Sequence, residues 1–294
     1  MANLKEIRIR IASVQSTQQI TKAMNMVSAA KLRKATDAIM QMRPYANKLQ
    51  EVLQNVSGTL DASTGGAFAA VRPVKKVLIV AVTSNRGLCG GFNANIIRSV
   101  NNIIAENYAP QAAAGNVKVM CIGKKAADFF SKNKNLFLSS HSEVFANLSF
   151  DSVAPIADHI MDEFATGNYD KVEVVYNRFK NAVVQVVTRE QVLPIVQAET
   201  TDAKKGMIND YIFEPDKESI VLDLIPKSIK IQLYKATLDS HASEHGARMT
   251  AMSKATDNAG ELLRSLRIFY NKARQAAITN EILEIVGGAN ALKG

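Results

Sequence analysis

The sequence predicts an α/β protein with two long terminal helices, which pair as an antiparallel two-helix coiled coil, and a small central α/β domain. Three observations predict this class. Glycine is absent from residues 1–57 and proline from residues 227–294. Apolar residues in both terminal segments recur in steps of three and four, the helical period. The middle alternates strand-like and helix-like stretches, which is typical of a mostly parallel sheet. We therefore divide the chain into an N-terminal coiled-coil helix (1–57), a central domain (58–225) and a C-terminal coiled-coil helix (226–294).

The first segment is predicted to be one helix. At 1.5 Å per residue it would be roughly 80 Å long. Pro44 is expected to kink it, or to remove one hydrogen bond, without ending it. Its apolar face comprises Leu4, Ile7, Ile11, Val14, Ile20, Met24, Val27, Ile39, Met42, Leu49 and Val52.

The middle is predicted to be a Rossmann-like α/β domain. "KKVLIVAVTS" (75–84) is typical of a buried strand and is followed by a glycine-rich turn and the helical "NANIIRSVNNIIAENY". "VKVMCIG" and "KKAADFFSK" repeat this strand–helix order. The remaining elements expected are a helix over 152–167, strands over 171–179 and 182–194, a short last strand over 211–215, and an entry linker over 57–67.

The last segment repeats the helical period, from Ile225 to Val286. Two such helices cannot both wrap a domain of about 170 residues, which is only about 30 to 40 Å across. They can hide their apolar stripes against each other, and antiparallel because they come from opposite chain ends. Around residues 236–260 the seam is rich in Ala, Ser, Thr and Gly. Such a thin pair of helices predicts a third surface around it. The end of the segment, 278–292, is apolar and poor in charge.

Charge is unevenly distributed along this chain of net charge +9. Residues 1–57 hold nine Lys and Arg against three acids, and residues 226–294 hold ten against six. The middle holds 17 against 18. This asymmetry predicts an anionic partner: nucleic acid, a membrane surface or an acidic protein.

Several classes of protein are not indicated by the sequence. We find no run of about 18 uncharged apolar residues to span a bilayer, and neither a signal nor a transit peptide at the start. Cys89 and Cys121 are too few for a disulfide framework or a metal site, so a reducing cytosolic setting fits. No Ser-His-Asp set, paired carboxylates or cofactor motif is present. We expect no catalytic residues, no cofactor and no metal.

Three motifs have alternative interpretations. "TSNRGLCGGFN" (83–93) stands where a phosphate-binding loop would lie, but it lacks the Walker Lys-Ser/Thr and the G-x-G-x-x-G spacing, so a tight turn with a functional surface is the better interpretation. "HASEH" (241–245) matches an inverted zinc-protease pattern, yet we expect it on an exposed helix without a third ligand. The basic runs 31–34 and 265–274 could contact nucleic acid, but without interleaved aromatics; Phe269 and Tyr270 are expected to pack.

The chain resembles the γ subunit of F-type ATP synthase along its whole length. The resemblance is carried by "IRIASVQSTQQITKAMNMVSAAKLRKA" at the start, "NRGLCGGFN" in the middle and "ASEHGARMTAMSKATDNAGELLRSLRIFYNKARQAAITNEILEIVGGA" at the end. One departure is Asn85, where the family more often has Asp, so one charge of that loop is in doubt.

The resemblance implies a non-catalytic central rotor shaft. Rotation of the membrane c-ring, driven by protons or by sodium, would force the catalytic β subunits through different nucleotide states for ATP synthesis, or hydrolysis in reverse. A part in regulating ATPase activity and proton flow is also implied. The implied partners are the α and β subunits (one γ per three pairs), the ε subunit and the c-ring, with no nucleic acid and no membrane span. The implied location is the cytoplasmic side of the bacterial cytoplasmic membrane, as a peripheral protein.

The resemblance also implies functional residues. Those implied for rotor–β contact or coupling are Met24, Arg248, Arg274, Gln275 and Thr279. Packing of a coiled coil is an equally good interpretation of Met24. The residues implied for the contact loop at the foot of the shaft are Asn85, Arg86, Gly87, Leu88, Cys89, Gly90 and Gly91. A basic coiled-coil scaffold that binds nucleic acid remains the alternative function at this point.

Overall fold

The computed structural model describes residues 4–57, 68, 70, 72–195 and 217–291. The chain divides into two compact units, one of residues 1–28 with 249–294 and one of residues 29–248. Helices α1 (Leu4–Ser57) and α7 (Lys217–Ala291) each contribute to both units. This division differs in kind from the three segments inferred from sequence, whose boundaries stay a prediction.

The larger unit contains a five-stranded sheet in the order β3-β2-β1-β4-β5. The strands are β1 (Val77–Val82), β2 (Val117–Ile122), β3 (Phe137–Ser140), β4 (Lys171–Phe179) and β5 (Gln185–Leu193). The first four are parallel and β5 is antiparallel to β4. The mostly parallel sheet is thus confirmed. Strand β3 was missed because it is short and only half-buried, with no apolar run. The expected strand over 211–215 and most of the expected linker, 58–67, lie outside the described residues.

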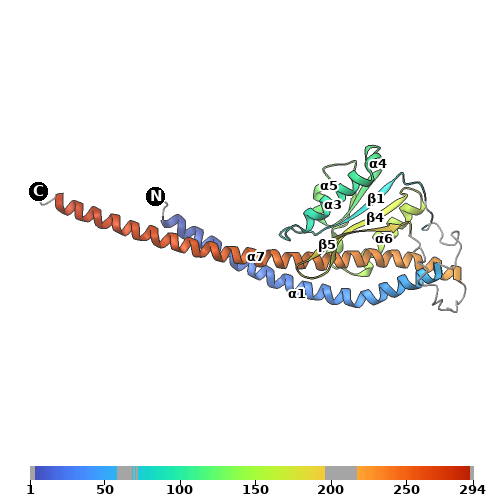
Figure 1. The fold of residues 1–294 in the computed structure, drawn as a ribbon, viewed down its shortest axis with the longest axis horizontal. Coiled ribbons are helices and arrows are strands. Elements are labelled where there is room, and N and C mark those ends of the chain that lie inside the picture. The colour runs from blue at the N-terminus through green and yellow to red at the C-terminus, as the bar shows by residue number, and fades with distance from the viewer. Residues whose placement is uncertain (1–3, 58–67, 69, 71, 196–216, 292–294) are drawn as a thin grey trace. The chain divides into compact units, whose positions relative to one another are not determined.

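Helices cover both faces of this sheet (Figure 1). On one face, α3 (Phe92–Asn107) and α5 (Lys124–Phe130) pack residues such as Ile96 and Phe130 onto β1 and β2. On the other face lie α6 (Phe150–Ala165) and the first half of α7. Short helices α4 (Ala109–Ala113) and η1 (Glu143–Phe145) fill connections. Strand β1 is buried along its whole length, as its unbroken apolar run predicts.

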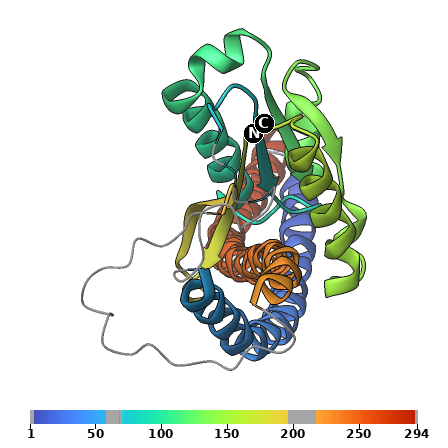
Figure 2. The same ribbon diagram turned by 90° about the vertical axis from the view of Figure 1, so that its right-hand side faces the viewer.

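Helix α7 is buried on nearly all sides between residues 233 and 248 (Figure 2). Helix α1 packs on one side, through Ala35 and Ile39 against Leu238 and Ala242. The α/β domain packs on the other side. The third surface expected for the small-residue seam is therefore, over this stretch, the chain's own domain. Pro44 lies inside α1, and the helix continues through it, as expected.

Side-chain hydrogen bonds attach α7 to both neighbours in the larger unit. The Ser243 hydroxyl donates to the carbonyl oxygen of Asn177 on β4, 2.9 Å away. Arg43 on α1 pairs with the buried carboxylate of Asp239 at 3.5 Å. A Cβ added to Gly246 would lie 3.0 Å from the carbonyl oxygen of Ala182, so glycine allows the β4–β5 hairpin to approach the helix.

In the smaller unit, α1 and α7 run antiparallel. Arg8 donates to the hydroxyl of Tyr270 at 2.9 Å, and Asn25 donates to the carbonyl of Met249 at 3.1 Å. Between these contacts Thr256 donates to Thr21 at 2.8 Å. The seam combines these polar contacts with buried apolar side chains such as Ile7, Leu263 and Leu266. The antiparallel coiled coil predicted from sequence is confirmed. After Tyr270, α7 continues for about six turns, well past Leu4, where α1 begins.

Candidate functional site

The loop of residues 85–91, which we call the contact loop, is a tight turn between β1 and α3. Leu88 has a φ of 64° and Gly90 a φ of 59°, so two residues adopt the left-handed conformation. Ser84 and Asn93 close the base of the turn: the Ser84 N–H donates to Asn93 Oδ1 at 2.9 Å, and Asn93 Nδ2 donates to Ser84 Oγ at 2.8 Å. Cys89 is buried in the turn, and burial raises the pKa of its thiol. The exposed face of the loop is therefore Arg86, Leu88, Gly90 and Gly91.

The N-terminus of α5, beside the contact loop, does not form an open phosphate cradle. A nucleotide at the carboxyl ends of β1 and β2 would need free backbone N–H groups. The first turn of α5 instead donates within the protein, from Lys124 N to Asn85 Oδ1 (3.0 Å), Lys125 N to Ser84 O (3.1 Å) and Ala126 N to Thr83 Oγ1 (2.9 Å). These N–H groups are unavailable to an anion. The geometry agrees with the prediction that this segment is a tight turn whose exposed face is available for contact with another protein.

Asn85 connects the contact loop to two other segments. Its Nδ2 donates to the carbonyl oxygen of Ser142 at 2.7 Å, and its Oδ1 accepts from the N–H of Lys124 at 3.0 Å. A carboxylate could accept the second bond but could not donate the first. The amide therefore makes an internal bridge that an aspartate at this position could not complete.

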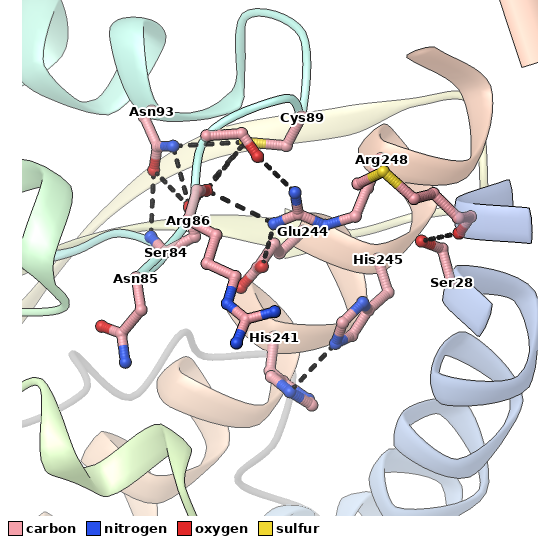
Figure 3. A network of polar contacts seen from close by, with 12 residues as sticks. Ser28, Ser84, Asn85, Arg86, Cys89, Asn93, His241, Glu244, His245 and Arg248 are labelled. Carbon is pink, nitrogen blue, oxygen red and sulfur yellow. Dashed lines mark hydrogen bonds and ion pairs between the residues drawn. The ribbon is translucent and has the colours of Figure 1, made fainter. Parts of the chain in front are cut away.

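Arg248 joins α7 to the contact loop (Figure 3). Its guanidinium donates to the carbonyl oxygens of Gly87 and Arg86, the latter at 3.3 Å, and pairs with the Glu244 carboxylate one turn earlier. Both side chains are buried, Arg248 to 7 % exposure and Glu244 to 8 %. The sequence placed Arg248 among coupling residues and Arg86 and Gly87 in the loop. The structure brings these two groups together, and it adds Glu244, which the sequence reasoning missed.

The "HASEH" motif is buried, which corrects the expectation of an exposed helix. The rings of His241 and His245 meet edge to face with their Nε2 atoms 3.2 Å apart, and His241 stacks on Phe145. Burial lowers the pKa of His241 to about 4 and that of His245 to about 3. Both rings are therefore neutral at physiological pH. Among the described residues, no group of three or more His, Cys, Asp and Glu side chains could hold a metal ion.

The other predicted coupling residues lie in the smaller unit. Met24 is half-buried, and its carbonyl accepts a hydrogen bond from Ser28 at 2.7 Å. Arg274, Gln275 and Thr279 are exposed; Thr279 donates to the Gln275 carbonyl at 2.9 Å. Phe269 was expected to pack and is instead 49 % exposed. The roles of these residues in coupling stay predictions.

Comparison with known proteins gives a consistent family over the full length. A family model described as ATP synthase matches residues 3–292. The chain is 60 % identical to the ATP synthase gamma chain of Flavobacterium psychrophilum over the whole of both chains. It is 53 % identical to that of Cytophaga hutchinsonii over 99 % of each chain, and 48 % identical to that of Chlorobaculum tepidum over 100 % of each.

Solved structures agree with this. A chain of the central stalk and c-ring of the Tetrahymena thermophila mitochondrial ATP synthase is 27 % identical, with a TM-score of 0.59, and the match covers 80 % of this chain and 99 % of that one. A rotor chain of the Euglena gracilis mitochondrial ATP synthase, 22 % identical, shares the fold with a TM-score of 0.67 over 94 % and 98 % of the two chains. The long paired helices, the mostly parallel sheet and these matches point one way: the chain belongs to the ATP synthase gamma chain family.

Proposed function

We propose that this chain is the central rotor shaft of a bacterial F-type ATP synthase. It couples rotation of the membrane c-ring to conformational changes in the catalytic β subunits, for ATP synthesis and, in reverse, hydrolysis. The chain catalyses nothing itself. It takes part in regulating ATPase activity and proton flow because it connects the c-ring to the catalytic β subunits.

The single observation that carries this proposal is the exposed apolar end of α7, residues 278–291, which we call the tip. Its large apolar side chains are half to three-quarters exposed: Ile278, Ile282, Leu283, Ile285 and Val286. Burying apolar surface contributes roughly 25 cal/mol per Å², so a contiguous exposed patch of this kind marks an interaction site. A ring of α and β subunits supplies an apolar sleeve in which small and aliphatic side chains can turn without fixed polar contacts.

Below the tip, exposed cations line the helices of the smaller unit. Examples are Arg10 and Lys22 on α1, and Arg264, Arg267 and Lys272 on α7. Acidic loops of the β subunits match these faces in charge. An asymmetric shaft makes a different contact with each of three similar β subunits, and each contact biases its subunit toward a different conformation.

The proposed partners are the α and β subunits, with one copy of this chain per three pairs, the ε subunit and the c-ring. The contact loop contributes to the contact at the foot of the shaft. No helix among residues 4–57, 72–195 and 217–291 is long and apolar enough to cross a bilayer. We place the protein on the cytoplasmic side of the bacterial cytoplasmic membrane, held there by its partners.

The alternative function, a basic scaffold for nucleic acid, has no support from the comparisons. Acidic protein loops also explain the basic residues better, because the exposed aromatic residues near them, such as Tyr45 on α1 and Phe269 on α7, are too few for a series of stacked bases.

Purification of the native complex tests the proposal. We expect the chain to co-purify with α and β subunits at one copy per three pairs, and a chain truncated after Tyr270 to lose most of its ability to couple hydrolysis to proton pumping. The isolated chain should show no ATPase activity. A full-length chain that does not enter the complex, or that binds duplex DNA in preference to it, would contradict the proposal.

A further inference from the structure

We propose that Glu244 is a positioning residue: it orients Arg248 so that α7 is fastened to the backbone of the contact loop, and through it to the sheet. This inference rests on the proposed rotor function. It assigns to the buried Glu244–Arg248 pair the task of making the α/β domain and the shaft helix turn as one body.

The geometry separates the roles of the two side chains. Arg248 donates to two main-chain carbonyls of the contact loop, those of Arg86 and Gly87. Glu244 accepts a hydrogen bond from the Arg248 guanidinium. A planar guanidinium has five donors in a fixed fork, so a carboxylate bound at one edge sets the direction of the others. Glu244 therefore acts on the loop through Arg248.

Glu244 is an anion at a junction with three cations. Burial raises the pKa of its carboxyl group, and three cations oppose that rise: Arg248 on α7, Lys31 on α1 and Arg86 in the loop. His241 and His245, on either side of it along the helix, have lowered pKa values and stay neutral. Without the Glu244 charge, the three cations would repel one another around a buried guanidinium.

The loop carries the attachment directly into the sheet. It follows β1 and opens α3, and the Ser84–Asn93 bonds at its base hold it rigid. Because Arg248 binds carbonyl oxygens, a force on α7 reaches the main chain next to the central strand without passing through a flexible loop side chain. A second attachment on the same helix, Ser243 to the Asn177 carbonyl, reaches the neighbouring strand β4. Together they anchor α7 at two adjacent strands.

The test uses the assembled complex with four variants of this chain. Glu244→Gln keeps the size and one acceptor but removes the charge. The exchanged pair Glu244→Arg with Arg248→Glu keeps an ion pair one turn apart but removes the donors to the loop carbonyls. Arg248→Lys keeps one positive charge without the fork. Asp223→Asn removes the acid of an exposed pair of the same i, i+4 spacing on the same helix, Asp223 with Lys227, and is the matched control.

Two quantities are measured: amide hydrogen exchange across residues 85–95, and protons pumped per ATP hydrolysed. We expect Glu244→Gln to speed exchange of the loop amides by about tenfold or more, since a tenfold change needs only about 1.4 kcal/mol, and to lower pumping per ATP. The exchanged pair should exchange its loop amides as fast as Glu244→Gln and pump no more protons per ATP. Arg248→Lys should give intermediate values of both quantities, and Asp223→Asn should match the parent.

The outcomes separate this inference from the rotor function. Unchanged loop exchange in Glu244→Gln would overturn the fastening, and so would full recovery in the exchanged pair, because a simple ion pair would then suffice. Faster exchange with unchanged pumping per ATP would overturn its use in coupling. A parent chain that fails to join α and β subunits contradicts the rotor function itself, and the exchange measurement still decides whether Glu244 fastens the loop.

Discussion

Two stretches of the same helix, α7, have opposite environments. Residues 229–248 include polar and charged side chains that are almost completely buried, among them Asp239, Ser243 and Glu244. Residues 271–291 include large aliphatic side chains that are exposed. Composition alone would assign the first stretch to the surface and the second to a core.

Burial along this helix therefore depends on which hydrogen-bonding and packing partners lie next to each stretch. In the first stretch, each polar group named above has a partner in the same chain: Arg43, the Asn177 carbonyl and Arg248. Buried polar groups are tolerated when they are hydrogen-bonded. The second stretch extends past Leu4, where α1 begins, so its large apolar side chains stay exposed among the described residues. The proposed rotor function supplies one from another subunit.

The largest effect should come from truncating one leucine in each stretch of the isolated chain. Leu233 is 1 % exposed in the core, and Leu283 is 63 % exposed. Leu233→Ala leaves a cavity and should lower the free energy of unfolding by about 2–5 kcal/mol, whereas Leu283→Ala should change it by less than about 0.5 kcal/mol. Urea denaturation followed by circular dichroism measures both. Similar losses would show that the tip packs within the chain.

The next largest contrast is between two glycines of α7, whose replacement by alanine should change the stability in opposite directions. Gly246→Ala places a methyl group 3.0–3.2 Å from the backbone of Ala182 and should destabilise the chain by about 1–3 kcal/mol through overpacking. Gly287→Ala meets nothing within 4 Å and should strengthen the helix by up to about 1 kcal/mol. Thermal unfolding of both variants, with helix content monitored for Gly287→Ala, compares them. A gain in stability from Gly246→Ala would mean that the hairpin does not press against α7.

In the assembled complex the exposed stretch should become the sensitive one. Arg274→Ala with Gln275→Ala removes an exposed pair able to bind and release a carboxylate. We expect normal subunit ratios but ATP turnover lowered about tenfold, which corresponds to about 1.4 kcal/mol of lost contact. Asn271→Ala, at a neighbouring exposed and uncharged residue, is the control. An intact complex with unchanged hydrolysis and pumping would show that Arg274 and Gln275 are ordinary solvated residues.

The smallest effect concerns Asp239, buried in the first stretch. Burial raises the pKa of its carboxyl group, and Arg43 and Lys235 only partly oppose the rise. The folded-state pKa of Asp239 therefore lies above the unfolded value of about 3.9. The contribution of this carboxyl group to stability is fully present below about pH 3.9 and is lost as the pH rises through the folded-state pKa. Asp239→Asn should therefore raise stability at pH 7 by on the order of 1 kcal/mol.

The gain from Asp239→Asn should shrink as pH falls toward about 3.9, where the parent carboxyl becomes protonated. Denaturation curves from pH 3 to 7 would show this, with Asp257→Asn, at an exposed aspartate of the same helix, as the matched control. A loss of stability in Asp239→Asn at pH 7 would show that the Arg43 pair outweighs the cost of burial.

Much of the fold could be predicted from periodicity. The continuous helix from Leu4, strands β1 and β2 and the antiparallel pairing all follow from apolar spacing and from the positions of Pro and Gly. Strand β3 could not be predicted, because three half-buried residues and one exposed residue carry too weak a pattern. Of the candidate site, the contact loop was placed correctly as a tight turn after a strand. Its attachment to Arg248 lies across more than 160 positions of sequence, and local spacing carries no signal of such a contact.

Most of the helices and strands, the two segments where positive charge accumulates and the apolar character of the tip follow from the sequence alone, because they depend on local periodicity and composition. The tertiary structure alone shows that the "HASEH" segment is buried, that Glu244 pairs with Arg248 while the two histidines contact each other, and that the α/β domain is the third surface around residues 233–248 of α7. The physical reason is that burial and pairing depend on which distant segments meet. From sequence alone, a charged residue such as Glu244 is predicted to be exposed to solvent. Its burial becomes understandable only when the fold brings cations from α1, α7 and the contact loop around it.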